Sequence, residues 1–119
     1  DAYAFVANLI KSAKKSIILI DNYVDETVLI LLSKRSDKVS AMIYTKNISK
    51  QLGLALKKHN EQYPSIEIKE FTKSHDRFLI IDEKTIYHIG ASLKDLGRKW
   101  FAFSRIKLNA KDLIDSLNT

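Results

Sequence analysis

The spacing of apolar positions along the chain predicts helices and short strands that alternate. Over residues 2–13 apolar side chains recur at helical spacing, which is typical of an amphipathic helix. Residues 16–20 follow as a short apolar run, the pattern of a buried strand. The next predicted elements are a helix over 26–34 capped by Asp25, a strand over 39–44, a helix over 48–60 capped by Asn47, and a strand over 66–71.

The second half of the chain predicts a hairpin, one more strand and a final helix. Strands over 77–82 and 85–89 are separated only by Glu83 and Lys84, which is the spacing of a tight hairpin turn. One helical turn is expected at 92–96, a sixth strand ending near Leu108, and a short helix beginning at Asn109 or Asp112. This order predicts an α/β fold with a mixed β-sheet of about six strands flanked by helices.

Length and composition limit the class of protein. We expect residues 1–119 to form a single domain, because this length supports one hydrophobic core but not two. Cysteine is absent, which excludes disulfides and thiolate metal sites and is compatible with a cytoplasmic location. No apolar run approaches the ~18 residues of a transmembrane helix, and no signal peptide is visible. The chain opens at Asp1 and ends after an amphipathic segment, so we expect it to be the C-terminal part of a longer protein.

The charge balance favours a polyanionic partner. The net charge is +6, with 20 lysines and arginines against 14 aspartates and glutamates. Nucleic acid and anionic lipid headgroups are both partners of this kind. Basic residues interleave with aromatic ones after Gly90, a composition that suits a nucleic-acid groove, although aromatic side chains in a strand are usually part of the core.

The candidate chemistry lies where predicted strands begin or end. His75 and Arg77 are two residues apart and therefore lie on the same side of an extended chain. The second hairpin strand ends at Gly90-Ala91-Ser92, so a polar pair and a serine could meet and bind an anion. Asp21, Asn22 and Tyr23 follow a buried strand and could line a cleft, or could serve local turn chemistry. His59 is predicted to pack on its helix, and the face on which His88 lies is left open.

The central stretch resembles the phospholipase D superfamily motif. That motif reads His-x-Lys, four residues, Asp, and then Gly-Ser-x-Asn beyond the next strand; here His75-Asp76-Arg77 is followed by four residues, Asp82 and Gly90-Ala91-Ser92. The resemblance implies a phospholipase D-like fold over nearly the whole chain. It also implies His75 as a metal-independent nucleophile, Arg77 as the cation beside the phosphate, and Asp82 as a support of the histidine or of nearby backbone. No cofactor and no metal are implied.

The departures from that motif favour binding over turnover. Arg77 stands where the family has lysine, and a guanidinium is not equivalent to a point ammonium. Either Ala91 or Ser92 takes the serine position, and in the second case Lys94 takes the position of asparagine. A chain with one motif would also have to dimerise across the site, so a homodimer is expected.

Two subgroups share the His-Asp-Arg form. One is the phospholipase D-like domain at the C-terminus of MIT-domain proteins, which is associated with membrane lipids and also resembles the turn at residues 20–25. The other is the C-terminal region of bacterial and phage-type DNA-binding proteins, which resembles residues 75–80 and 90–97 more closely. We therefore expect a domain that binds the DNA phosphodiester backbone through His75, Arg77, Ser92 and Lys94. The alternatives are a metal-independent nuclease and an anionic phospholipid-binding module.

Overall fold

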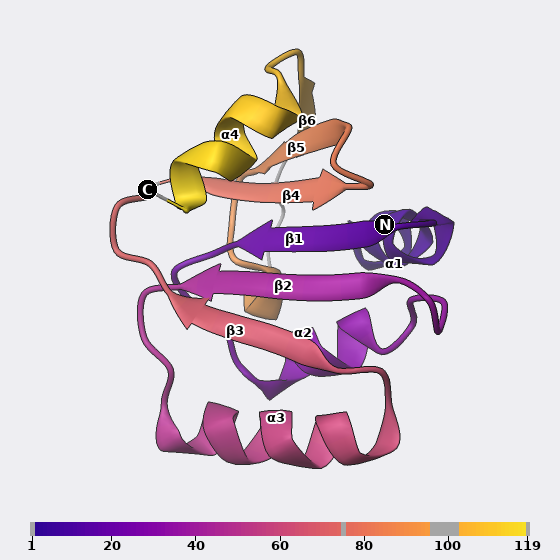
Figure 1. Ribbon diagram of the computed structural model, residues 1–119, viewed down its shortest axis with the longest axis vertical. Coiled ribbons are helices and arrows are strands. Elements are labelled where there is room, and N and C mark those ends of the chain that lie inside the picture. The colour runs from indigo at the N-terminus through magenta and orange to yellow at the C-terminus, as the bar shows by residue number, and fades with distance from the viewer. Residues whose placement is uncertain (1, 75, 96–102, 119) are drawn as a thin grey trace.

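A six-stranded mixed sheet forms the middle layer of the computed structural model, which describes residues 2–74, 76–95 and 103–118 (Figure 1). The strands are β1 (Ser16–Ile20), β2 (Ser40–Thr45), β3 (Ile66–Glu70), β4 (Arg77–Ile81), β5 (Thr85–Ile89) and β6 (Phe103–Ile106). Their order in the sheet is β3-β2-β1-β4-β5-β6. The first three are parallel to one another, whereas β4 is antiparallel to β1 and β5 and β6 continue the antiparallel half.

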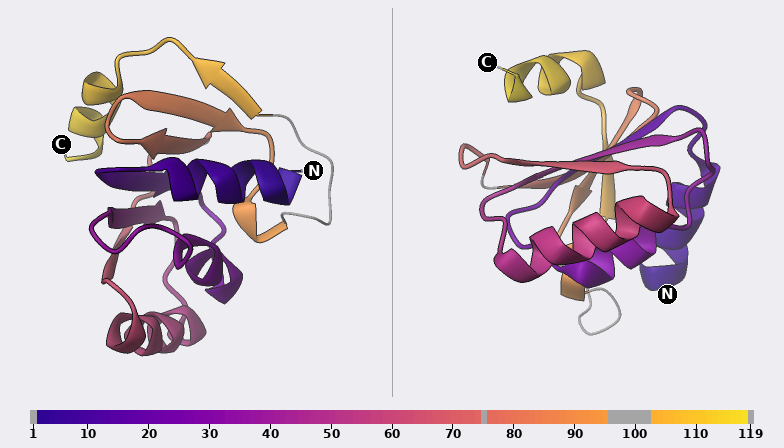
Figure 2. Two further views of the ribbon diagram at one scale, coloured as in Figure 1. Left: turned by 90° about the vertical axis from the view of Figure 1, so that its right-hand side faces the viewer. Right: turned by 60° about the horizontal axis from the view of Figure 1, so that its bottom comes forward.

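Helices cover both faces of this sheet. Helices α1 (Ala2–Ser12), α2 (Glu26–Leu32) and α3 (Lys50–Gln62) lie on one face, and α4 (Ala110–Leu117) lies on the other (Figure 2). The short 3-10 helix η1 (Leu93–Asp95) follows β5. The predicted α/β class with a mixed sheet flanked by helices is confirmed.

The alternation of side chains along β1 explains the two cores. All five residues of β1 are buried. Ile17 and Leu19 pack toward α1, α2 and α3, whereas Ile18 and Ile20 pack toward α4. Each fully buried aliphatic side chain of this kind contributes about 1.5–3 kcal/mol relative to an exposed one. A strand buried on both faces therefore shows a continuous apolar run instead of alternation.

Side-chain caps fix where the helices begin. Asp25 caps α2 by accepting a hydrogen bond from the Thr27 N–H, as its position before the apolar stripe predicted. Asn109 caps α4 in the same way. The prediction for α3 was wrong: Ser49 rather than Asn47 is the cap, because its hydroxyl accepts from the Leu52 N–H.

The hairpin between β4 and β5 turns through two residues of left-handed backbone. Asp82 has φ 57° and Glu83 has φ 58°, and the Lys84 N–H donates to the Ile81 carbonyl across them at 3.1 Å. Because Ile81 pairs with Thr85, three residues separate the strands, one more than predicted, and Asp82 belongs to the turn instead of the strand. None of the helices in the described ranges is long and apolar enough to cross a membrane. Trp100 and Phe101, expected in part to be core residues, lie outside the described residues.

Candidate anion-binding site

Three strand ends meet around Arg77. Ile20 at the end of β1 pairs with Phe78 of β4, so Asp21 lies beside Arg77 at the same edge of the sheet. Arg77 itself pairs with Ile89 at the end of β5, which brings the segment carrying Ser92 to this edge as well. The sheet register therefore gathers residues that are far apart in the sequence, and it does so where the parallel half of the sheet meets the antiparallel half.

A chain of hydrogen bonds orients the Arg77 side chain. Its Nε donates to the Ser92 hydroxyl at 3.1 Å, and that hydroxyl donates to Asp21 Oδ1 at 2.9 Å. The direct distance from Arg77 Nε to Asp21 Oδ1 is 3.8 Å. Within the described part of the chain, Arg77 makes these contacts through Nε alone. The Arg77 side chain remains 29% exposed, so its terminal nitrogens can reach a ligand.

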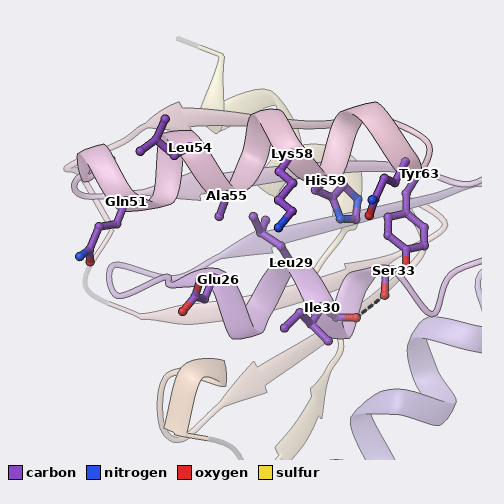
Figure 3. A pocket seen from close by; sticks show the side chains of 11 residues that line it. Glu26, Leu29, Ile30, Ser33, Gln51, Leu54, Ala55, Lys58, His59 and Tyr63 are labelled. Atoms are coloured by element: carbon purple, nitrogen blue, oxygen red, sulfur yellow. Dashed lines mark hydrogen bonds between the residues drawn. The ribbon is translucent and has the colours of Figure 1, made fainter.

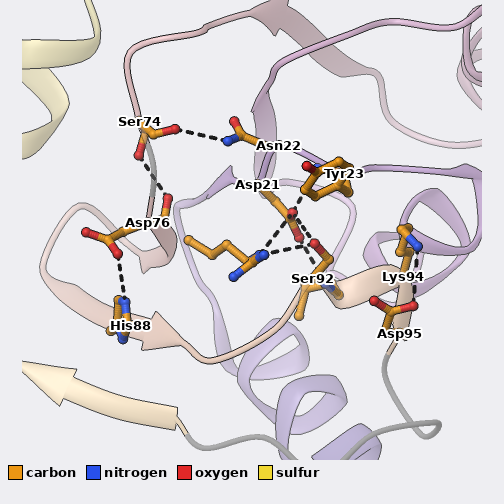
Figure 4. A network of polar contacts seen from close by, with 11 residues as sticks. Asp21, Asn22, Tyr23, Ser74, Asp76, His88, Ser92, Lys94 and Asp95 are labelled. Carbon is orange, nitrogen blue, oxygen red and sulfur yellow. Dashed lines mark hydrogen bonds and ion pairs between the residues drawn. The ribbon is translucent and has the colours of Figure 1, made fainter.

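Asp21 is the buried centre of this arrangement. Its side chain is fully buried, and Oδ2 accepts from the Leu93 N–H at 2.9 Å while Oδ1 also accepts from the Tyr23 N–H at 3.1 Å (Figure 4). Burial raises the pKa of the Asp21 carboxyl, although hydrogen bonds from Leu93, Tyr23 and Ser92 and the nearby Arg77 charge act in the opposite direction. Asp21 thus joins the β1, β4 and β5 ends instead of facing solvent.

The neighbours of Asp21 have different roles. Asn22 donates from Nδ2 to the Ser74 carbonyl at 3.0 Å, and the Ser74 hydroxyl donates to the Asp76 carbonyl at 2.8 Å. Both residues that flank His75 are therefore fixed, while His75 itself lies outside the described residues. Tyr23 is 54% exposed at the surface of this edge.

The structure does not bring Asp82 to Arg77. The two residues lie at opposite ends of β4, about 16 Å apart for five residues of extended strand. The Asp82 carboxylate accepts from the backbone N–H groups of Lys14, Lys15 and Ser16, with its shortest bond at 2.7 Å. Asp82 was predicted to support either the histidine or nearby backbone. In the structure it binds the backbone of residues 14–16, at the start of β1, which is not part of the anion site.

Lys94 and His88 lie outside the Arg77 hydrogen-bond chain. Lys94 Nζ is 3.3 Å from Asp95 Oδ1, so its charge is paired locally. His88 lies on the α4 face of the sheet, where it packs edge-on against Phe78 and its Nε2 is 3.5 Å from Asp76 Oδ1. Arg77 points to the other face, because side chains alternate along β4. The sequence alone did not indicate on which face of the sheet His88 lies. Its pairing with Phe78 places it on the α4 face.

A separate hollow of about 630 Å³ lies between α2 and α3 (Figure 3). Leu29, Ala55 and His59 are among its lining residues, and Asp21, Arg77 and Ser92 are not. His59 is buried and stacks on Tyr63 at a centroid distance of 4.9 Å, and burial together with the Arg35 charge lowers its pKa. His59 therefore packs on its helix, as the sequence predicted.

Across the described ranges, no group of three or more histidine, cysteine, aspartate or glutamate residues could hold a metal ion.

Comparison with known proteins identifies the fold. No family model matches the sequence, and no curated protein matches it. NucT from Helicobacter pylori has a similar structure, with a TM-score of 0.70 and 15% identity over 99% of this chain and 87% of NucT. The archaeal chromatin protein TrmBL2, described as showing a novel mode of DNA binding, has a TM-score of 0.64 and 17% identity. That match covers 98% of this chain and 47% of TrmBL2, so the chain spans about half of that protein. Together these likenesses show that the chain shares its α/β fold with both proteins.

Proposed function

We propose that this domain binds the phosphodiester backbone of DNA at the edge of the sheet that carries Arg77. The observation that carries the proposal is the anchoring of Arg77 Nε by Ser92, which is itself held by the buried Asp21. A guanidinium fixed in this way presents its remaining N–H groups in one orientation, and its fork matches the paired oxygens of a phosphate. The fold shared with TrmBL2, for which DNA binding is described, supports DNA as the polyanion.

In this proposal Ser92 and Lys94 have roles that differ from the direct phosphate contacts that the sequence predicted. Ser92 is buried and its hydroxyl already bridges Arg77 and Asp21, so it acts by positioning the guanidinium. Lys94 is paired with Asp95, so we assign it a secondary part in phosphate contact. Arg77 thus carries the main contact, with His75 expected beside it from the spacing in the sequence.

The test is the salt dependence of duplex binding by wild type and three variants. Arg77→Ala removes the contact and should weaken binding several-fold and reduce the slope of log K against log salt concentration by about 0.9. Arg77→Lys keeps the charge but loses the Nε bond to Ser92, so we expect intermediate affinity. Lys57→Ala on the exposed surface of α3 is the control for the loss of one charge. An affinity unchanged in Arg77→Ala would sink the proposal, and tighter binding to anionic vesicles than to duplex would identify a lipid module.

A metal-independent nuclease is the second candidate, favoured by the fixed residues on both sides of His75. Asn22 donates to the Ser74 carbonyl and Ser74 donates to that of Asp76, so the described residues next to His75 in the sequence are both hydrogen-bonded. In the resembling family the histidine attacks phosphorus, the bond to the leaving oxygen breaks, and a second histidine protonates that oxygen. Water then hydrolyses the phosphohistidine. Here the second histidine would be His75 of another copy, so this candidate requires a homodimer.

The oligomeric state gives a direct check on that requirement. We expect a dimer of this 119-residue chain in light scattering after size exclusion, at concentrations where activity or binding is measured. A monomer at those concentrations would exclude the shared-site nuclease and leave backbone binding through Arg77 intact. A cytoplasmic location stays a prediction from the sequence.

A further inference from the structure

A group of exposed lysines lies at the end of the sheet away from Arg77. Where β1, β2 and β5 begin and β4 and β6 end, the described residues present six exposed lysines, which we call the lysine edge: Lys11, Lys14, Lys15, Lys38, Lys84 and Lys107. This edge is at the right of the sheet in Figure 1 and faces the viewer in the left panel of Figure 2. We propose that the lysine edge is a second nucleic-acid-binding surface, distinct from the Arg77 site.

The sheet register places these lysines in a row. Lys15 directly precedes β1 and Lys38 lies two residues before β2, and the Ser40 N–H donates to the Lys15 carbonyl at 3.2 Å. Lys84 lies in the turn between β4 and β5, and Lys107 follows β6, whose last residue, Ile106, pairs with Ile86. From β2 to β6 the row crosses four strand spacings, about 19 Å. One strand of duplex DNA presents roughly six phosphates over that length.

The charges of this row are available to a ligand. Among the ion pairs of the described residues, none includes a lysine of the lysine edge. The nearby Asp82 accepts hydrogen bonds from the backbone N–H groups of Lys14, Lys15 and Ser16, and its charge attracts Lys14 without forming an ion pair with it. At the other edge, by contrast, Arg77 and Lys94 are both paired with carboxylates. Six exposed lysines without an ion pair in the described chain therefore gather at this end of the sheet, where Asp37, Asp82 and Glu83 are the neighbouring acidic residues.

Two surface hollows lie along the row. One, of about 630 Å³, lies between the end of α1 and the approach to β2, and its charged lining residues are three lysines and one carboxylate: Lys11, Lys14, Lys38 and Asp37. The other, of about 340 Å³, is lined by Lys84, Arg105 and Lys107. Hollows rimmed by cations concentrate phosphate groups more strongly than a flat surface does.

The shape of the row favours a polynucleotide over a membrane. A row along a sheet edge follows a linear polyanion, whereas stable anchoring to a membrane combines a basic patch with a second contribution, such as an apolar face that inserts several side chains. Leu108, which is 61% exposed, is the large apolar residue beside Lys107. One such side chain is too few for interfacial insertion. Nucleic acid is therefore the partner that we assign.

The test compares two paired variants with equal loss of charge. Lys38→Gln/Lys84→Gln removes two members of the row, and Lys57→Gln/Lys58→Gln removes two exposed lysines of α3. With a labelled DNA duplex at ~0.1 M salt, we expect the first pair to weaken binding about tenfold or more and to reduce the salt slope by about 1.8. The α3 pair should remain close to wild type. Circular dichroism and thermal unfolding confirm that both pairs are folded.

Adding Arg77→Ala separates this proposal from the proposed function. If Arg77→Ala has no effect while Lys38→Gln/Lys84→Gln weakens binding, the Arg77 site fails and the lysine edge stands. Equal effects of the two lysine pairs, or no effect of either, would overturn the second surface. Tighter lysine-dependent binding to vesicles with anionic headgroups than to duplex would overturn nucleic acid as its partner.

Discussion

Arg77 and Asp21 face each other across the antiparallel pair of β4 and β1, with Arg77 Nε 3.8 Å from Asp21 Oδ1 and Ser92 bonded to both. Asp21 is fully buried, so its carboxylate is a structural anchor for a cation that is itself partly exposed. A buried carboxylate thus holds a cation that reaches the surface. Its sensitivity to mutation should differ between the buried anchor and the exposed cation.

Replacing the anchor should destabilise the fold. Asp21→Asn gives a poorer acceptor to the groups that now donate to the carboxylate or lie beside it, which belong to Ser92, Tyr23, Leu93 and Arg77. We expect this substitution to lower the free energy of unfolding by about 1–3 kcal/mol. Urea unfolding monitored by tryptophan fluorescence measures this loss. The matched control is Asp37→Asn on the exposed surface, which should change stability by less than about 0.5 kcal/mol. Equal stability of the two variants would contradict the anchoring role.

The same variant should change how stability depends on pH. Because burial raises the Asp21 pKa above its usual value of 3.8, the unfolded chain releases this proton first as pH rises. As the pH rises from 3.8 to the raised pKa, ionisation of Asp21 therefore reduces the stability of the fold. Above that pKa, Asp21 causes no further loss of stability. Asp21→Asn lacks this decline. Thermal unfolding of both proteins across the acidic range would show it as a gap in stability between wild type and Asp21→Asn that is widest at the lowest pH values and narrows as the pH rises.

Ser92→Ala should weaken DNA binding more than it weakens the fold. The hydroxyl bridges Arg77 and Asp21, so its loss frees the guanidinium to rotate and lowers the preorganisation of the phosphate contact. We expect a several-fold loss of affinity with an unchanged salt slope, because the number of charges is the same. Ser116→Ala, at an exposed position of α4, is the control. A reduced salt slope would instead mean that Arg77 has left the interface.

Asp82 should contribute stability that is lost in acid. Although burial opposes it, hydrogen bonds from the Lys15, Ser16 and Lys14 backbone lower the Asp82 pKa below 3.8. Its contribution is therefore present above pH 3.8 and lost as the pH falls through the lowered value. Asp82→Asn keeps a residue that tolerates the φ of 57° and isolates the charge, whereas Asp82→Ala adds backbone strain. Thermal unfolding should rank them wild type, Asn, Ala at neutral pH, and the gap between wild type and Asn should close in acid.

Hydrolysis is tested by cleavage in EDTA. If the nuclease candidate holds, plasmid or single-stranded DNA is cut without divalent metal, and His75→Ala abolishes the cutting. Arg77→Lys, which restores the family's residue, should then raise the rate or leave it unchanged. His88→Ala, on the other face of the sheet, should cut like wild type. Absence of cleavage by wild type over a broad pH range would remove this candidate.

Much of the fold could be predicted because short-range patterns determine it. The run at residues 16–20 gave β1 with its observed bounds, and the spacing around Glu83 and Lys84 gave the hairpin. The cap of α3 was misplaced because asparagine and serine both cap helices, and only the fold decides which side chain reaches the first turn. Polar residues after strand ends indicated the segments that the sheet brings together at Arg77.

The partners within the site could not be predicted from local patterns. The bond between Ser92 and Asp21 joins residues 71 positions apart, and it depends on β4 pairing with β1. Asp82 was grouped with His75 and Arg77 because the family motif contains all three. The length of a five-residue strand already separates Asp82 from Arg77, so the rise per residue was a usable signal.

Asp21 and its hydrogen-bond partners are far apart in the sequence, and this separation determines how late in folding the site can form. Helix α2 can form from local contacts, and β1 can pair with β2 across 24 positions of the chain. The Asp21 carboxylate receives Ser92 and Leu93 only after the chain has closed a loop of about 70 residues. A nascent or partly unfolded chain should therefore have a guanidinium without its fixed orientation. Binding to DNA through Arg77 would then report that β1, β4 and the segment after β5 have come together, so affinity should recover among the last signals in a refolding experiment.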